Sequence, residues 1–132
     1  MSALAILLRP AIQEFIQKNI TKNIADIAFQ KNPFENEIEW RDILNQIQSK
    51  QKAKNKLPSW YQHDNIIFPS SLSIEQTSSE ITAQFKSQLI SGQALIDLTG
   101  GFGVDDYYFA KRFESVIHCE MNTTVSEIVA HN

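Results

Sequence analysis

The sequence predicts an α/β fold that is mostly helical, in which a helical N-terminal domain precedes a single, incomplete β-α-β unit. Apolar side chains recur at helical spacing through the first half of the chain. After a helical segment, two short apolar runs at residues 94–98 and 115–120 lie on either side of a glycine-rich turn. Parallel strands joined by a helix have this arrangement. We expect a helical domain over residues 1–57, an extended connector over 58–72 and the start of the β-α-β domain over 73–132.

Composition favours a soluble globular protein, because 42% of the 132 residues are hydrophobic and 20% are charged. Residues 1–56 carry nine Lys or Arg against six Asp or Glu, whereas residues 57–132 carry three against nine. The single cysteine, Cys119, excludes an internal disulfide and favours a reducing, cytoplasmic location. The apolar run at residues 3–8 is too short to cross a bilayer, so we expect no membrane partner.

Short helices are expected in the first half. Pro10 suits the first position of one helix, and Thr21 can cap a second. Asn36, with Glu39 three residues later, can cap a third and longer helix. Pro58 should end that helix, since the residue before a proline disfavours helical backbone.

The second half is expected to open with one long helix. Ser73 followed by Gln76 is a capping box, and the residues at positions 74, 77, 81, 85 and 89 then lie along one face. Gly92 is a suitable end for this helix. A strand over residues 94–98, a turn over 100–103, a helix over 104–113 and a second strand over 115–120 follow.

The chain stops inside one more expected helix. Thr123 or Thr124 can cap it, and it is unfinished at residue 132. Two parallel strands hide neither their faces nor their edges. We therefore expect either a homo-oligomeric contact across the exposed strands or a partly disordered C-terminal end.

A strand, a glycine turn, a helix and a second strand ending in an acid form the arrangement of a nucleotide-binding unit. Glycines let a ligand approach the backbone, and the acid can accept hydrogen bonds from both hydroxyls of a ribose. That acid is Glu120, 17 residues beyond Gly103. A dinucleotide-binding oxidoreductase is a less favoured alternative, because Asp106 stands where its third glycine would fall.

The sequence DLTGGFGVD at residues 97–105 resembles motif I of class I methyltransferases that use S-adenosylmethionine (SAM), commonly D-x-G-x-G-x-G. Gly101 and Gly103 match the last two glycines, and Thr99 replaces the first. Together with residues 72–80, the motif resembles a bacterial methyltransferase group that has a THUMP-like C-terminal region. The resemblance implies a Rossmann-like SAM fold, truncated here, with SAM as its cofactor.

The resemblance also implies a role for each matching residue. Asp97 would face the methionine amino group, and Gly101 and Gly103 would lie under the methionine and ribose portions. Glu120 would bind the ribose hydroxyls, and Met121 would pack on the adenine. The candidate cofactor-binding residues are Gln76, Ser79, Asp97, Thr99, Gly101, Phe102, Gly103, Glu120 and Met121.

Gln76 and either Ser78 or Ser79 would line the methionine side of the pocket. In this fold the groups that deprotonate the acceptor usually follow the fourth strand. Only two strands are expected here, so the catalytic residues stay unassigned. No metal site is expected, since Cys119 reads as a core residue and has no metal-ligand spacing with a histidine.

The resemblance makes RNA the expected substrate class of a parent methyltransferase, and we expect this chain alone to be inactive. The alternative is a nucleotide-, RNA- or protein-binding module without methyltransferase activity. Lysines at 50, 52, 54 and 56 could contact RNA beside Trp60 and Tyr61. A solvated helix end, where lysines favour the C-terminal dipole, is the preferred interpretation of that stretch.

Overall fold

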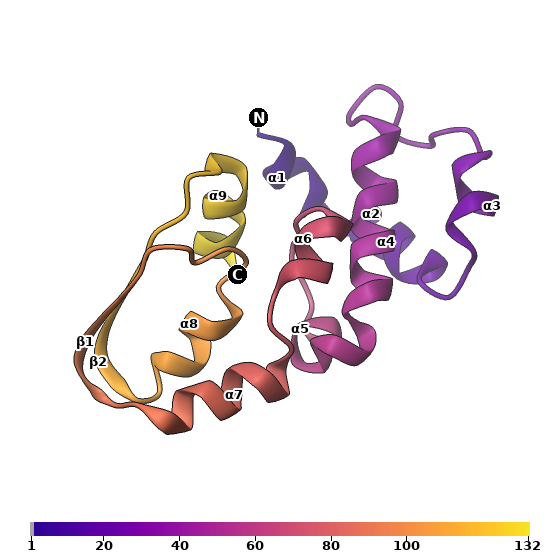
Figure 1. Ribbon diagram of the computed structural model, residues 1–132. Coiled ribbons are helices and arrows are strands. Elements are labelled where there is room, and N and C mark those ends of the chain that lie inside the picture. The colour runs from indigo at the N-terminus through magenta and orange to yellow at the C-terminus, as the bar shows by residue number, and fades with distance from the viewer. Residues whose placement is uncertain (1) are drawn as a thin grey trace.

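The computed structural model describes residues 2–132, which are mostly helical with one two-stranded parallel sheet. The helical half holds α1 (Ala3–Leu7), α2 (Pro10–Asn19), α3 (Ile24–Ala28), α4 (Trp40–Lys56), α5 (Pro58–Gln62) and α6 (Ser71–Gln76). The other half holds α7 (Glu80–Leu89), β1 (Gly92–Asp97), α8 (Val104–Phe109), β2 (Phe113–His118) and α9 (Thr123–His131). Figure 1 shows the two halves side by side, with α7 running from the helical half to the sheet.

Two helix starts in the first half differ from the prediction. The side chain of Asn23 caps α3, where Thr21 was the expected cap. The long helix α4 begins at Trp40 without a side-chain cap, and not at Asn36. The reason is Asn32, whose side chain bonds the backbone two and six residues later and holds this segment in a turn.

The expected extended connector is only partly extended. Pro58 occupies the first turn of α5, where its missing N–H costs nothing. Residues 66–70 form neither helix nor strand, and the side chain of Gln46 pairs with both backbone groups of Phe68, at 2.7 and 2.9 Å. Asn132 pairs in the same way with the backbone of Ile67, at 3.0 and 2.9 Å. These pairings replace a strand partner and tie the segment to both halves of the molecule.

The helix expected to start at Ser73 is two helices, and residues 77–79 separate α6 from α7. Ser70 caps the first of them and Ser79 caps the second. The break has a tertiary cause. The Glu80 carboxylate accepts hydrogen bonds from the Ser59 amide at 2.6 Å and hydroxyl at 2.8 Å, which fixes the start of α7 against α5.

The face that α7 buries is the opposite of the one predicted. Ile81, Phe85 and Leu89 are exposed. The buried side chains are Glu80 at the start of the helix and two small ones, Ala83 and Ser87, on the face that packs against α8. Small side chains allow this close packing, and Gly92 then begins β1 where a helix end was expected.

The predicted parallel pairing of the two strands is confirmed, with Ala94 opposite Ser115 and Ile96 opposite Ile117. Both strands begin two residues earlier than expected, and α8 ends before residue 113. Ile96 and Ile117 share one exposed face of the sheet. The homo-oligomeric contact expected across these strands stays a prediction, as does any sheet beyond them.

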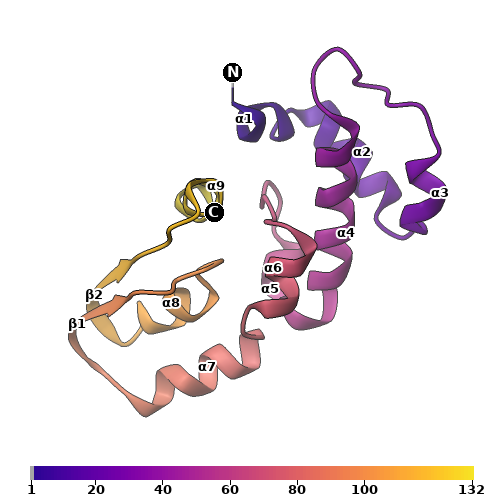
Figure 2. The ribbon, with the colours of Figure 1, turned by 45° about the horizontal axis from the view of Figure 1, so that its top comes forward.

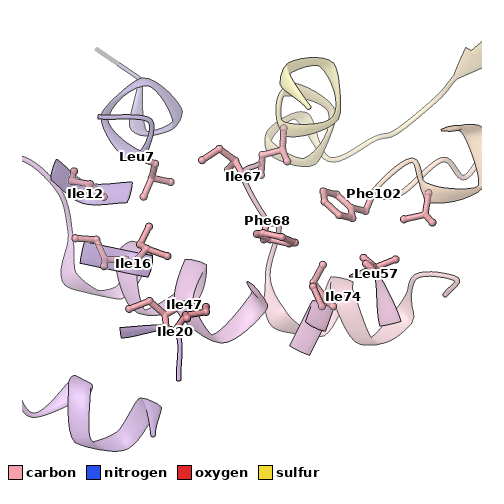
Figure 3. Close-up of a cluster of buried hydrophobic side chains, with 14 of the residues drawn as sticks. Leu7, Ile12, Ile16, Ile20, Ile47, Leu57, Ile67, Phe68, Ile74 and Phe102 are labelled. Carbon is pink, nitrogen blue, oxygen red and sulfur yellow. The ribbon is translucent and has the colours of Figure 1, made fainter. Parts of the chain in front are cut away.

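One hydrophobic core serves both halves. In Figure 3 it runs from Leu7 and Ile12 in the helical half, past Phe68 in the connector, to Phe102 in the glycine turn. The Phe68 and Phe102 rings lie 6.0 Å apart between centroids. In the second view, Figure 2, α8 lies between the sheet and α7. Helix α9 lies nearer to α1 than α8 does. Within residues 2–132, no helix has the length and apolar character needed to cross a bilayer.

Candidate functional site

The glycine turn between β1 and α8 is held against the end of β2. The Asp97 carboxylate accepts a hydrogen bond from the Thr99 amide at 2.9 Å. The Gly100 amide donates to the Cys119 carbonyl at 2.9 Å, so the pairing of the strands continues into the turn. A Cβ at Gly100 would lie 2.2 Å from Nδ1 of His118, so this position admits only glycine without a shift of the ring.

The other two glycines provide the backbone conformation of the turn. Gly101 has φ of 53° and Gly103 has φ of 78°, a left-handed region that other residues enter at a cost. A Cβ at Gly101 would meet only the Thr99 carbonyl oxygen, at 3.9 Å, so the space beside this residue is open.

Glu120 faces the turn from the loop after β2. One carboxylate oxygen accepts a hydrogen bond from the Gly101 amide at 3.1 Å, and the other accepts one from the Asn122 amide at 2.7 Å. Each carboxylate oxygen has two lone pairs, so each can still accept a hydrogen bond from a ligand hydroxyl. Glu120 and the glycine turn therefore lie against each other in the fold.

The segment between α6 and α7 forms the facing wall. The Ser78 hydroxyl donates to one oxygen of Asp105, at 3.0 Å, and the Lys86 ammonium donates to the same oxygen at 2.8 Å. These bonds hold the segment against the first turn of α8. The second oxygen of Asp105 is buried and has no partner among the described residues.

A cavity of about 390 Å³ lies between these walls, within the size range of small-molecule sites. Its lining is Ser73, Gln76, Thr77, Ser78, Thr99, Gly100, Gly101, Phe102, Val104, Asp105, Glu120, Asn122 and Val125. Of the candidate residues, the structure brings together Gln76, Thr99, Gly101, Phe102 and Glu120.

Four candidates lie outside this lining. Asp97 bonds to the turn backbone, Ser79 caps α7, and Gly103 lines a second cavity. Met121, which the resemblance assigns to the adenine face, is 97% exposed and does not line this cavity. Asp105 was not among the expected site residues, although it is the last residue of the DLTGGFGVD motif.

The lysine stretch at the end of α4 is largely engaged within the chain. Lys50 is buried, and its ammonium lies 5.8 Å from the centre of the Tyr61 ring. Lys52 forms an ion pair with Glu75, and Lys56 donates to the backbone carbonyl of the same residue at 2.5 Å. This packing favours the interpretation as a helix end over that of an RNA-contacting patch.

Comparison with known proteins agrees with this architecture. No family model matches the sequence, and no curated protein matches it either. A crystal structure of a proposed methyltransferase from Porphyromonas gingivalis W83 matches with a TM-score of 0.76 and 28% sequence identity. The match covers 100% of this chain and 32% of that chain, so this chain spans about a third of that protein's length. The chain therefore has a methyltransferase-like fold, mostly helical with a small parallel sheet.

Proposed function

We propose that this chain carries a SAM-binding half-site of a methyltransferase whose substrate class is RNA. The observation that carries the cofactor proposal is the opposition of Glu120 and the positive-φ glycine turn across one cavity. The likeness to a proposed methyltransferase supports it. RNA rests on the family resemblance of residues 72–80 and 97–105 alone.

The residues present suit the parts of SAM. Glu120 offers acceptors for the two ribose hydroxyls. Asp105 lines the same cavity, and its unpartnered oxygen offers an acceptor to the methionine ammonium. SAM supplies its own reactive methyl group on a sulfonium, so the protein's task is to align it with an acceptor.

We also propose that this chain alone does not transfer methyl groups. Met121 is 97% exposed, so no contact among the described residues holds its side chain in place to pack on an adenine. The two carboxylates of the lining are not assigned as the base that deprotonates a methyl acceptor. Glu120 is hydrogen-bonded to the glycine turn, and Asp105 is hydrogen-bonded to Ser78 and Lys86.

Calorimetric titration with S-adenosylhomocysteine tests the proposal. We expect binding by the wild-type chain and at least a tenfold loss, roughly, in Glu120→Ala, since two hydrogen bonds to a charged acceptor disappear. Glu114→Ala, on the exposed start of β2, is the matched control and should bind as the wild type does. Thermal unfolding of both variants checks that they fold.

Absence of binding by the folded wild-type chain, or equal binding by Glu120→Ala, contradicts the half-site. A parallel titration with NADH separates the oxidoreductase alternative. Tighter binding of NADH than of S-adenosylhomocysteine would overturn the SAM assignment in favour of a dinucleotide site.

A further inference from the structure

A second cavity, of about 380 Å³, lies behind the glycine turn, between α5, α8 and β2. Trp60, Phe102 and Tyr107 supply aromatic lining. The Trp60 ring lies 5.1 Å from the Tyr107 ring and 6.5 Å from the Phe102 ring, centroid to centroid. Such a wall suits a planar ring, which can stack on or meet the edges of its neighbours.

A buried acid–imidazole pair lies in the same cavity. Asp106 is 8% exposed, and one of its carboxylate oxygens is hydrogen-bonded to Nδ1 of His118 at 2.6 Å. The other oxygen of Asp106 and Nε2 of His118 are buried without a partner among the described residues. Leaving such groups unpaired costs free energy, and it is uncommon in folded proteins.

Two other polar side chains of the cavity are occupied. The His63 ring is hydrogen-bonded to the Ser59 carbonyl at 2.9 Å. The Asn132 amide uses both its oxygen and its nitrogen on the backbone of Ile67. Of the buried side-chain N and O atoms that line this cavity, those without a partner among the described residues belong to Asp106 and His118. Desolvation by burial, with smaller contributions from a side-chain hydrogen bond and the charge of Asp97, raises the pKa of Asp106 to about 6, against the lowering effect of the His118 hydrogen bond.

We propose that this cavity binds a planar heteroaromatic group that donates a hydrogen bond from an exocyclic amino group to the free oxygen of Asp106. The ring lies among Trp60, Phe102 and Tyr107. A hydrocarbon ring would leave the carboxylate unpaired, and an aliphatic amine would leave the aromatic wall unused. The site is separate from the SAM cavity, from which the turn residue Phe102 divides it.

Titration with adenine, followed by ¹H–¹⁵N and methyl NMR of the full chain, tests this site. Purine, which has the same ring without the amino group, is the matched ligand. We expect adenine to bind about tenfold more tightly than purine, since the lost hydrogen bond has a charged acceptor. The signals of the Trp60 indole and of the Val116 and Val129 methyl groups should shift.

Variants separate this cavity from the SAM cavity. Asp106→Asn should remove most of the preference for adenine over purine, and Trp60→Leu should weaken both ligands. Glu120→Ala should leave adenine binding unchanged, so the result does not depend on the proposed cofactor site. An oligoadenylate in place of adenine shows whether a base carried on a nucleic acid also enters.

Two results would overturn the proposal. One is an absence of preference for adenine over purine in the wild-type chain. The other is a set of adenine-induced shifts confined to Gly101 and Glu120, with none at Trp60 or Val129. Both are measured on the wild-type chain, so neither depends on a variant that fails to fold.

Discussion

Replacing Asp106 with Asn should stabilise the protein at neutral pH and give little or no gain in acid. Burial, more than any other cause, raises the pKa of this carboxyl from 3.8 to about 6 in the folded state, and the neighbouring Asp97 raises it further. The hydrogen bond to His118 opposes these effects. The folded protein therefore retains a proton on Asp106 that the unfolded chain has already lost between pH 3.8 and about 6.

The sign and size of the effect follow from linkage. A group that binds its proton more tightly when folded contributes stability below pH 3.8 and loses it as pH rises through about 6. A shift of one pKa unit corresponds to about 1.4 kcal/mol, so the cost of ionising Asp106 is at most about 3 kcal/mol. Asn at this position avoids the charge and can still accept a hydrogen bond from His118.

Urea unfolding at pH 3.5 and pH 7.5, without ligand, measures the effect. The free energy of unfolding of Asp106→Asn minus that of the wild type should rise by about 2 to 3 kcal/mol between the two conditions. Asp26→Asn, on the exposed surface of α3, should show a far smaller change. A difference that stays within about 0.5 kcal/mol across this range would refute the reasoning, since surface substitutions change stability by that amount.

Two further predictions concern the connector segment at Phe68 and the glycine turn. Gln46→Leu leaves the N–H and C=O of Phe68 buried without partners, so we expect a loss of about 2 to 4 kcal/mol in urea unfolding; a loss below about 1 kcal/mol would contradict it. Gly100→Ala should cost about 3 kcal/mol, because the added Cβ meets the His118 ring. Gly101→Ala, where the space is open and only the positive φ is strained, should cost about 1 to 2 kcal/mol. Equal losses at the two glycines would show that the ring moves aside.

The sequence predicted what local chemistry decides. Glycines with a following helix and an acid after a second apolar run indicated the turn, and the Glu120 carboxylate accepts a hydrogen bond from the Gly101 amide of that turn. The parallel pairing followed from two short apolar runs separated by a helix. Gln76 lines the cavity although the helix predicted to contain it was too long. It is the last residue of α6 and precedes the break at residues 77–79.

The errors arose where tertiary contacts chose between equivalent local signals. Ser70, Ser73 and Ser79 are all competent caps, and the contact of Glu80 with α5 decides which of them begins α7. The sequence pattern of α7 also gives no sign that Ala83 would be buried in place of Phe85. Such a choice depends on the size of the neighbouring helix face, which is not encoded locally.

Side chains from the helical half and the connector help to hold the glycine turn in place. Phe102 is buried against Phe68 of the connector, and the Tyr108 hydroxyl donates a hydrogen bond to Glu80 at 3.4 Å, beside the Ser59 contact with α5. The turn is therefore fixed from behind by side chains that lie outside the β-α-β unit. It follows that changes in the helical half should alter ligand binding at the turn, whichever of the two cavities the ligand occupies.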